Sequence, residues 1–274
     1  MTAPFDNLNG KIVLAGAGKM GQAMLEGWLK AGLAPSALIV LEPHPSDDIA
    51  ALCAKGLALN PIRTDATQIA ALVIAVKPQM FAEAAPMLRK FVGAQTVVVS
   101  IMAGRTLQGI AQELGGGAIV RAMPNTPAAI GRGISIVVPS AGVNETQRVL
   151  AEALLAAAGK VEWIDDEALM DAVTAVSGSG PAYVFLLAEE LARAGIAAGL
   201  PEALAVTLAR ETVAGSGELL HRSSLDAATL RQNVTSPGGT TAAALDVLMD
   251  ENGLRALLTR AVAAATRRSR ELAG

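Results

Sequence analysis

Short apolar runs alternate with segments of helical periodicity over the first 165 residues. Runs rich in Val, Ile and Leu predict buried strands, and helical patterns separate them. Continuous apolar strands that alternate with helices are typical of a parallel sheet covered on both faces. The predicted strands are 11–15, 37–41, 71–76, 96–100 and 118–121, and the predicted helices are 19–31, 46–55, 79–91 and 106–114.

Two further β-rich runs, at 134–138 and 161–164, predict additional strands at the edge of this sheet. Asn144, followed three residues later by Gln147, predicts a capping box for a helix between them. After Asp165 no β-rich run follows. The pattern therefore predicts an α/β domain over residues 1–165 and an all-helical domain over residues 166–274.

The helical half is rich in Ala and Leu, and its last helix has an apolar stripe. Small side chains let helices approach closely, but a domain this poor in bulky residues has little material for its own core. We therefore expect it to be buried against another subunit. Pro181, Pro201 and Pro237 mark boundaries between the predicted helices. The apolar stripe consists of Leu254, Leu257, Leu258, Ala261, Val262 and Ala265.

Composition excludes several classes of protein. Of 274 residues 52% are hydrophobic and 17% charged, which is too apolar for disorder. The net charge of −3 gives no sign of a basic surface for nucleic acid, and with only 3% aromatic residues a base-stacking surface is not expected either. The single cysteine, Cys53, permits no internal disulfide and no multi-cysteine zinc site, and it fits a reducing compartment.

Neither a membrane span nor a secretion signal is expected. The longest run without a charged residue, 172–188, is interrupted by Ser-Gly-Ser-Gly-Pro and falls short of the roughly 20 apolar residues that a spanning helix needs. Residues 1–10 contain no apolar signal-peptide core. By exclusion we expect a cytoplasmic, globular protein.

A glycine-rich turn follows the strand at 11–15 directly and opens the next helix. Its sequence, Gly16-Ala17-Gly18-Lys19-Met20-Gly21, is the G-x-G-x-x-G pattern in the strand–turn–helix context that dinucleotide binding requires. The helix N-terminus would supply amide donors for a pyrophosphate. A merely structural glycine turn is the alternative. The interpretation we favour is a Rossmann-type parallel sheet.

Glu42 stands at the end of the second predicted strand. An acidic residue there can hydrogen-bond the adenosine ribose 2′-hydroxyl of NAD, and it would repel the 2′-phosphate of NADP. The alternative is an ordinary solvated glutamate, which the following Pro43-His44-Pro45 loop would turn away. His44 would at most touch the adenosine end.

The usual catalytic side chains are scarce. His221 sits between a leucine pair and an arginine, which favours a helix end, and no Lys follows Lys160. A hydroxy-acid dehydrogenase would place a catalytic Lys in its helical domain, so that class is disfavoured. No nucleophilic triad and no metal site are indicated.

Four segments rich in glycine, proline and hydroxyl groups are more informative. Residues 75–79 and 121–128 leave predicted strands at the carboxyl edge of the sheet, where cofactors bind. Residues 177–183 and 235–241 open helices in the second half, and a Gly-Gly-Thr-Thr helix start suits a small carboxylate. Each alone is a capped helix start, but together they favour a shared cleft.

These segments also carry a family resemblance. Gly-Ala-Gly-Lys-Met-Gly at 16–21, Ala-Val-Lys-Pro-Gln at 75–79, Arg-Ala-Met-Pro-Asn-Thr-Pro-Ala at 121–128, Ser-Gly-Ser-Gly-Pro-Ala-Tyr at 177–183 and Thr-Ser-Pro-Gly-Gly-Thr-Thr at 235–241 resemble, in order, the motifs of the pyrroline-5-carboxylate reductases. The resemblance implies reduction of 1-pyrroline-5-carboxylate to L-proline, the last step of proline biosynthesis, with NADPH or NADH. It also implies a helical C-terminal dimerisation domain that forms a homodimer, and dimers that often assemble into a homodecamer. No nucleic-acid or membrane partner is implied.

The resemblance assigns roles by matched position. Glu42 departs from the family pattern, because members often have a small polar residue there and accept NADPH. The implied catalytic residue is Thr241, whose hydroxyl would lie near the ring nitrogen as hydrogen-bond partner and proton relay. The implied cofactor contacts are Gly16, Ala17, Gly18, Lys19, Met20 and Gly21 at the pyrophosphate, Ala75, Val76, Lys77, Pro78, Met102, Ala103 and Gly104 at the nicotinamide, and Asn125 in a neighbouring loop. The implied substrate contacts are Glu167, Asn233 and Val234 at its border and the backbone N–H groups of Gly238, Gly239 and Thr240 at its carboxylate.

Scarce acid–base groups suit this chemistry. A protonated imine is already an electrophile, so orientation and electrostatics carry most of the catalysis. The rival interpretations are a hydroxy-acid dehydrogenase and a non-catalytic dinucleotide sensor, and related cyclic imines of other ring sizes stay open as substrates.

Overall fold

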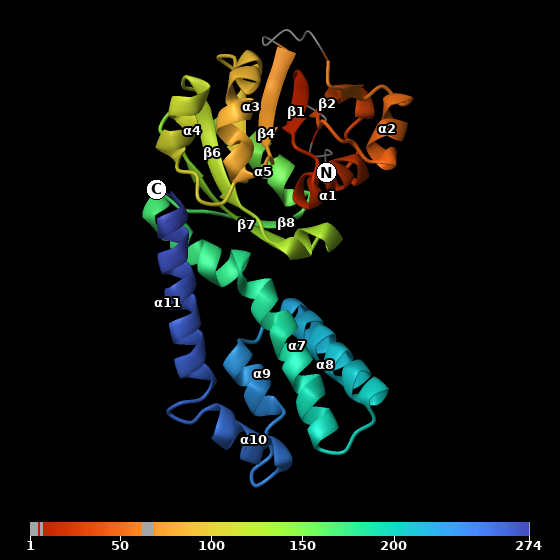
Figure 1. The fold of residues 1–274 in the computed structure, drawn as a ribbon, viewed down its shortest axis with the longest axis vertical. Helices are drawn as coiled ribbons and strands as arrows, with labels where there is room; N and C mark the ends of the chain where they lie inside the picture. The colour runs from red at the N-terminus through yellow and green to blue at the C-terminus, as the bar shows by residue number, and fades with distance from the viewer. Residues whose placement is uncertain (1–4, 6–7, 62–67, 274) are drawn as a thin grey trace. The chain divides into compact units, whose positions relative to one another are not determined.

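The protein consists of two compact units (Figure 1). The computed structural model describes residue 5, residues 8–61 and residues 68–273. The first unit comprises the described chain up to Gly178 together with the chain from Thr266 onward, and the second is Ser179–Ala265. The first unit thus contains residues 166–178 and the end of the last helix in addition to the α/β segment predicted at 1–165.

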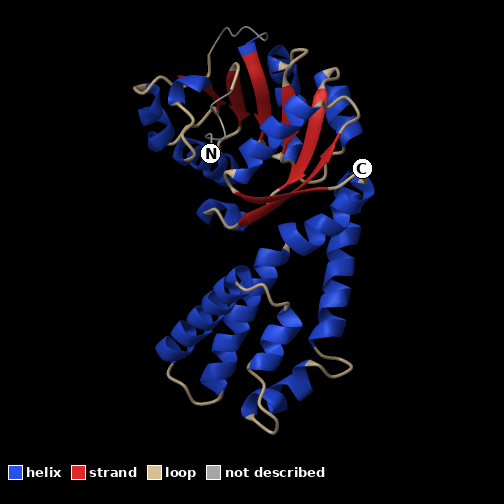
Figure 2. Ribbon diagram, turned by 180° about the vertical axis from the view of Figure 1, so that it is seen from behind, coloured by secondary structure: helices blue, strands red, loops and turns tan. Residues whose placement is uncertain are grey.

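The first unit is built on a sheet whose described strands number eight, in the order β3-β2-β1-β4-β5-β6-β7-β8 (Figure 2). All neighbours pair in parallel except β6 and β7, which are antiparallel. Because β1 lies between β2 and β4, the strand order reverses there, which is where such folds bind ligands. The strands are β1 Lys11–Ala15, β2 Leu38–Leu41, β3 Ala58–Leu59, β4 Ile69–Ile74, β5 Val97–Ser100, β6 Ala118–Met123, β7 Gly133–Pro139 and β8 Gly159–Trp163.

Alternate residues of each central strand enter separate cores on the two faces of the sheet. On β1, Ile12 and Leu14 join the cluster that contains Trp28, whereas Val13 joins the cluster that contains Phe81. This explains why the strands are apolar throughout rather than alternating. The predicted fold class, a parallel sheet covered by helices on both faces, is confirmed.

Side-chain caps mark the starts of three helices in this unit, α2, α4 and α5. Ser46 and Thr106 cap their helices by accepting hydrogen bonds from the N–H groups of Ile49 and Gly109. The predicted capping box of Asn144 and Gln147 is present. The helices are α1 Lys19–Lys30, α2 Asp47–Cys53, α3 Phe81–Leu88, α4 Leu107–Leu114, α5 Glu145–Ala156 and α6 Met170–Val173, with a π-helical segment at Thr174–Gly178.

The second unit, all of whose residues are described, is helical as predicted. In the single chain its buried helix residues are only the small Ala192, Ala205 and Ala209, whereas Phe185 is 67% exposed. Its helices are α7 Gly180–Ala197, α8 Glu202–Arg222, α9 Ala227–Asn233, α10 Thr240–Leu248 and the part of α11 (Leu254–Ala273) before Thr266. Within the described chain, no helix combines the length and hydropathy needed to cross a membrane.

Several sequence predictions need correction. β7 is not an edge strand, because it pairs with β6 on one side and β8 on the other. The predicted helix at 79–91 is a short α-helix with 3-10 turns at both ends, and Pro86 within it contributes no N–H. The strand predicted at 71–76 lies two residues earlier, at Ile69–Ile74. Ala75 and Val76 therefore belong to the loop that leaves the sheet.

The two-residue strand β3 was not predicted at all. It pairs in parallel with β2 through Ala58 and Leu59. A strand this short has no periodicity to detect. Its consequence is that Asn60 comes to lie beside the end of β2, where its N–H donates to the carbonyl of Val40 at 2.9 Å.

Candidate functional site

The glycine-rich turn joins β1 to α1 as predicted. Gly16 has a φ of 87°, and a Cβ there would lie 2.8 Å from the backbone of Ala75. A Cβ at Gly21 would lie 2.3 Å from the carbonyl oxygen of Gly16. These two glycines are required by the fold itself, because the turn packs directly on neighbouring backbone.

Gly18 is different, since a Cβ there would meet no atom within 4 Å. The fold does not need glycine at this position, but a ligand lying against the backbone does. Gly18 is also the N-cap of α1, which has no side-chain cap hydrogen bond and no acidic residue in its first turn. The first amides of a helix lack intrahelical partners, so this end suits a pyrophosphate. The residues present therefore fit a dinucleotide.

A cavity of about 260 Å³ adjoins this turn at the carboxyl edge of the sheet. Its position follows from parallel strands that end together, with the N–H of Ala75 donating to Ala15 O at 2.7 Å and that of Ile101 to Ile74 O at 3.0 Å. Four predicted cofactor residues contribute to its lining. The cavity is lined by Met20, Ala75, Val76, Ile101, Met123, Pro124, Asn125, Thr126 and Gly178.

The other predicted nicotinamide residues lie in the loops that follow β4 and β5. Lys77 is exposed, and the carbonyl of Pro78 accepts a hydrogen bond from Arg105 Nη2 at 2.7 Å. Met102 is buried and Ala103 is exposed. The cavity lining does not include Lys77, Pro78, Met102, Ala103 or Gly104. The loop residue Gly104 is buried and has a φ of 71°.

Asn125 is held from two sides. Its Oδ1 accepts from the N–H of Ile134 at 3.0 Å, and its Nδ2 donates to Ser177 Oγ at 3.3 Å. Asn125 therefore fixes the start of the β6–β7 connection against the π-helical segment that contains Ser177. A π-helical segment beside a cavity is a frequent feature of functional sites.

Glu42 reaches back to the glycine-rich turn. Its Oε2 accepts a hydrogen bond from the N–H of Ala17 at 2.8 Å, and its Oε1 accepts from the N–H of His44 at 3.0 Å. The Pro43-His44-Pro45 loop thus does not turn the carboxylate away. The carboxylate lies against the turn that the sequence assigns to the pyrophosphate.

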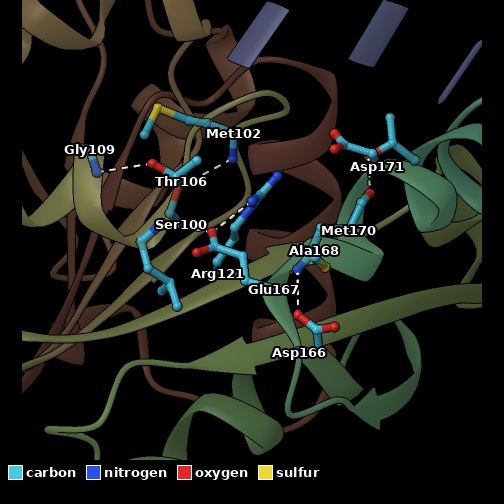
Figure 3. Close-up of polar contacts among 12 residues, drawn as sticks. Ser100, Met102, Thr106, Gly109, Arg121, Asp166, Glu167, Ala168, Met170 and Asp171 are labelled. Atoms are coloured by element: carbon cyan, nitrogen blue, oxygen red, sulfur yellow. Dashed lines mark hydrogen bonds and ion pairs between the residues drawn. The ribbon is translucent and has the colours of Figure 1, made fainter. Parts of the chain in front are cut away.

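Glu167 and Arg121 form the most buried charged pair among the described residues (Figure 3). Arg121 Nη1 and Glu167 Oε1 are 2.7 Å apart, and the side chains are 6% and 29% exposed. The same Oε1 accepts the N–H of Leu107, at the start of α4, at 2.8 Å. Glu167, predicted to border the substrate, thus ties α4 to β6. Arg121 was given no role from the sequence, although a charge inside an apolar strand was the available signal.

The remaining predicted substrate residues lie in the second unit, between the end of α9 and the start of α10. Asn233 and Val234 are exposed. The helix N-cap is Gly239, which has no side-chain cap, and its own N–H donates to Ser236 O at 3.0 Å. With the Gly239 N–H engaged in this way, the candidate donors at this turn are the N–H groups of Gly238, before it, and of the first-turn residues of α10, after it.

Thr240 is exposed and Thr241 half-buried at this helix start. Thr207 and Thr259, inside helices, donate their hydroxyls to the carbonyl four residues back. Thr241 stands in the first turn, where the chain four residues earlier is not helical. Among the described residues its hydroxyl has no hydrogen-bond partner, so it is available to a ligand.

A mainly parallel sheet that presents such a turn at its switch point places the chain among the dinucleotide-binding proteins of Rossmann type. A family model described as pyrroline-5-carboxylate reductase dimerisation matches residues 167–272, and one described as NADP oxidoreductase coenzyme F420-dependent matches residues 11–104.

Curated relatives and solved structures point the same way. The chain is 40% identical to pyrroline-5-carboxylate reductase of Synechocystis, over 94% of this chain and 97% of the relative, and 37% identical to that of Pisum sativum, over 94% of each. The structure of a pyrroline-5-carboxylate reductase from Coxiella burnetii superposes with a TM-score of 0.87 at 32% identity, covering 97% of this chain and 99% of the other. The chain belongs to the pyrroline-5-carboxylate reductase family, which confirms the resemblance drawn from its motifs.

Proposed function

We propose that this protein reduces 1-pyrroline-5-carboxylate to L-proline with NADPH or NADH. The observation that carries the proposal is the open turn at Gly18 beside a cavity to which Met20, Ala75, Val76 and Asn125 contribute. A turn that only closed the fold would not leave this space. Family membership supplies the substrate and the product.

Reduction of the imine requires little acid–base catalysis by the protein. When bound, the reduced nicotinamide supplies a hydride for the carbon of the C=N bond, and the nitrogen becomes the secondary amine of proline. A protonated imine is already electrophilic, so the residues act by orienting the substrate and by excluding water.

The N-terminus of α10 is the proposed site for the substrate carboxylate. An anion there is stabilised by first-turn amides and by the helix dipole. Because Gly239 N–H is engaged by Ser236 O, we assign the donor role to Gly238 and Thr240, while Gly239 shapes the turn. Glu167, Asn233 and Val234 are proposed to border the substrate.

Thr241 is the proposed catalytic residue. Its hydroxyl would hydrogen-bond the ring nitrogen and relay to it the proton that forms the protonated imine. The lack of a partner for this hydroxyl among the described residues supports the role. A helical threonine bonded to its own backbone would first have to give up that hydrogen bond.

The second unit is proposed to form a homodimer, with dimers assembling into a decamer. In the single chain the unit exposes large apolar side chains while burying only alanines, so it lacks a core of its own. A second copy of the same unit would supply one. The exposed set includes Val184, Phe185, Leu186, Leu187, Leu191, Leu219, Leu220, Leu254, Leu257 and Leu258.

The two domains predicted from the sequence are proposed to have different roles. Residues 1–165 are proposed as the dinucleotide-binding domain and residues 166–274 as the helical substrate and dimerisation domain. The match of the dimerisation family model from residue 167 supports this boundary. We also propose a cytoplasmic location without nucleic-acid or membrane partners, consistent with the exposed free thiol of Cys53.

A steady-state assay tests the function. Purified protein is mixed with NADH or NADPH and 1-pyrroline-5-carboxylate, and a 2-hydroxy acid with the oxidised cofactor serves as control. We expect cofactor oxidation only with the cyclic imine. Turnover of the hydroxy acid alone would favour a dehydrogenase, and nucleotide binding without any turnover would favour a sensor.

A further inference from the structure

Glu42 is held in place through its main chain as well as its carboxylate. Its N–H donates to Asn60 Oδ1 at 2.9 Å, and its carbonyl accepts from Asn60 Nδ2 at 2.8 Å. The Oδ1 and Nδ2 atoms of Asn60 therefore both hydrogen-bond to the backbone of Glu42. We call this pair of hydrogen bonds the Asn60 clasp.

Asn60 itself adopts an unusual backbone conformation. It is the one non-glycine residue in the described chain with a positive φ, 46°. Asparagine tolerates this left-handed region better than most residues, but the conformation still carries a cost. Glycine would remove the cost and also the clasp. The presence of asparagine at this position points to a use for its side chain.

The clasp and the carboxylate contacts act on the same residue. Asn60 fixes the backbone of Glu42, and the N–H groups of Ala17 and His44 fix its two carboxylate oxygens. An ionised carboxylate offers about four acceptor positions, and these two bonds use two of them. The carboxylate therefore keeps acceptor capacity toward a ligand at the end of β2.

We propose that Glu42, positioned by the Asn60 clasp, makes this protein select NADH over NADPH. The inference rests on the proposed function, since it concerns the cofactor of that reaction. The adenosine ribose of a bound dinucleotide lies at the end of the second strand in this class of fold. The 2′-hydroxyl of NADH would donate to the remaining acceptor positions of Glu42.

NADPH is disfavoured on two counts. Its 2′-phosphate offers no comparable donor to the carboxylate, and a phosphate monoester carries a charge of about −1.5 to −2 at pH 7. The like charges repel, and the contacts on both sides of Glu42 hold it against rotating away. The relative from Plasmodium falciparum was solved with NADP bound, so this preference is not carried over from relatives.

A structural brace is the competing account. In that account the carboxylate only satisfies Ala17 and His44, and the clasp only closes the β2–β3 connection. The two accounts differ in one measurable quantity, the ratio of the dissociation constants for NAD⁺ and NADP⁺. A brace affects stability and leaves the ratio unchanged.

Calorimetric titration of the full-length protein with NAD⁺ and with NADP⁺ tests the inference without relying on turnover. The variants are Glu42→Gln, which keeps the size and removes the charge, and Asn60→Gly, which keeps the backbone conformation and removes the clasp. Asp48→Asn is the matched control, because it removes an exposed charge from the first turn of the neighbouring helix α2. Melting temperatures are measured for all four proteins, and the kcat/KM ratio for NADH and NADPH is recorded alongside.

We expect the unsubstituted protein to bind NAD⁺ at least 10-fold tighter than NADP⁺. Glu42→Gln should reduce that preference by roughly 10- to 100-fold, the range for a hydrogen bond to a charged group. Asn60→Gly should reduce it by a smaller factor, and Asp48→Asn should leave it unchanged.

Equal or tighter binding of NADP⁺ by the unsubstituted protein overturns the inference and leaves the proposed function intact. An equal shift for Glu42→Gln and Asp48→Asn overturns the contact with the ribose, and an unchanged ratio in Asn60→Gly overturns the role of the clasp. Failure to bind either nucleotide instead counts against the proposed function itself.

Discussion

The guanidinium of Arg121 and the carboxylate of Glu167 form an ion pair, with 2.7 Å between Nη1 and Oε1, in which the arginine is almost fully buried. The same carboxylate oxygen accepts the N–H of Leu107. One side chain therefore joins the middle of the sheet to the start of α4, just after the loop that carries Met102, Ala103 and Gly104.

Glu167→Gln should destabilise the protein by about 1–3 kcal/mol, because it keeps an acceptor for Leu107 but leaves the charge of Arg121 uncompensated. The midpoint of chemical denaturation measures this. Glu162→Gln is the control, since the pair of Glu162 with Lys160 has the same 2.7 Å separation but is largely exposed. The control should lose less than about 1 kcal/mol. Equal losses in the two variants would contradict the structural role assigned to Glu167.

Two glycines of the same turn should respond differently to substitution by alanine. Gly21→Ala places a Cβ 2.3 Å from Gly16 O and should lower the melting temperature. Gly18→Ala meets no protein atom within 4 Å, so stability should hold while nucleotide binding weakens by about 10-fold or more. Gly142→Ala, at another open position, is the control. Unchanged nucleotide affinity in Gly18→Ala would remove the turn from the cofactor site.

Thr241→Ala should lower kcat for imine reduction by roughly 10- to 1000-fold, as expected for a lost positioning or proton-transfer contact. Thr241→Ser keeps the hydroxyl and should recover most of the rate. Thr207→Ala removes a threonine hydroxyl that bonds only to its own helix, at Ala203 O, and should leave kcat unchanged. Kinetics of Thr241→Ala equal to those of the unsubstituted protein would exclude the residue from the mechanism.

The apolar surface of the second unit should be an interface between copies. Phe185→Glu puts a charge at a position that is 67% exposed in the single chain, and it should dissociate or unfold the oligomer in sedimentation velocity. Met87→Glu, 46% exposed on α3, should leave the assembly intact. If Phe185→Glu sediments like the unsubstituted protein, Phe185 lies outside the interface.

The sequence predicts the parts of the fold that depend on long apolar periods and on local turn chemistry. The turn at 16–21 and the capping box of Asn144 are of this kind, as is the change to helices after residue 165. A two-residue strand such as β3 escapes detection because its pairing is decided by tertiary contacts. Asn60 therefore gave no signal, although the structure places its amide on Glu42.

Site residues divide in the same way. Met20, Ala75, Val76 and Asn125 come from motifs that end strands at one edge, and parallel topology gathers them at one cavity. The ion pair of Arg121 with Glu167 joins positions far apart in sequence, and only the folded chain shows it. Equally, the loop hydrogen bond of Gly239 N–H to Ser236 O depends on local geometry that composition does not encode.

Transfer of deuterium from reduced cofactor to product tests the central claim most directly. The protein is incubated with 1-pyrroline-5-carboxylate and NADH or NADPH carrying deuterium at the transferred C4 position of the nicotinamide, and the proline is examined by mass spectrometry and NMR. We predict L-proline with one deuterium on C5, the carbon of the former C=N bond. Proline without deuterium, or no proline at all while the protein binds the cofactor, would contradict the account.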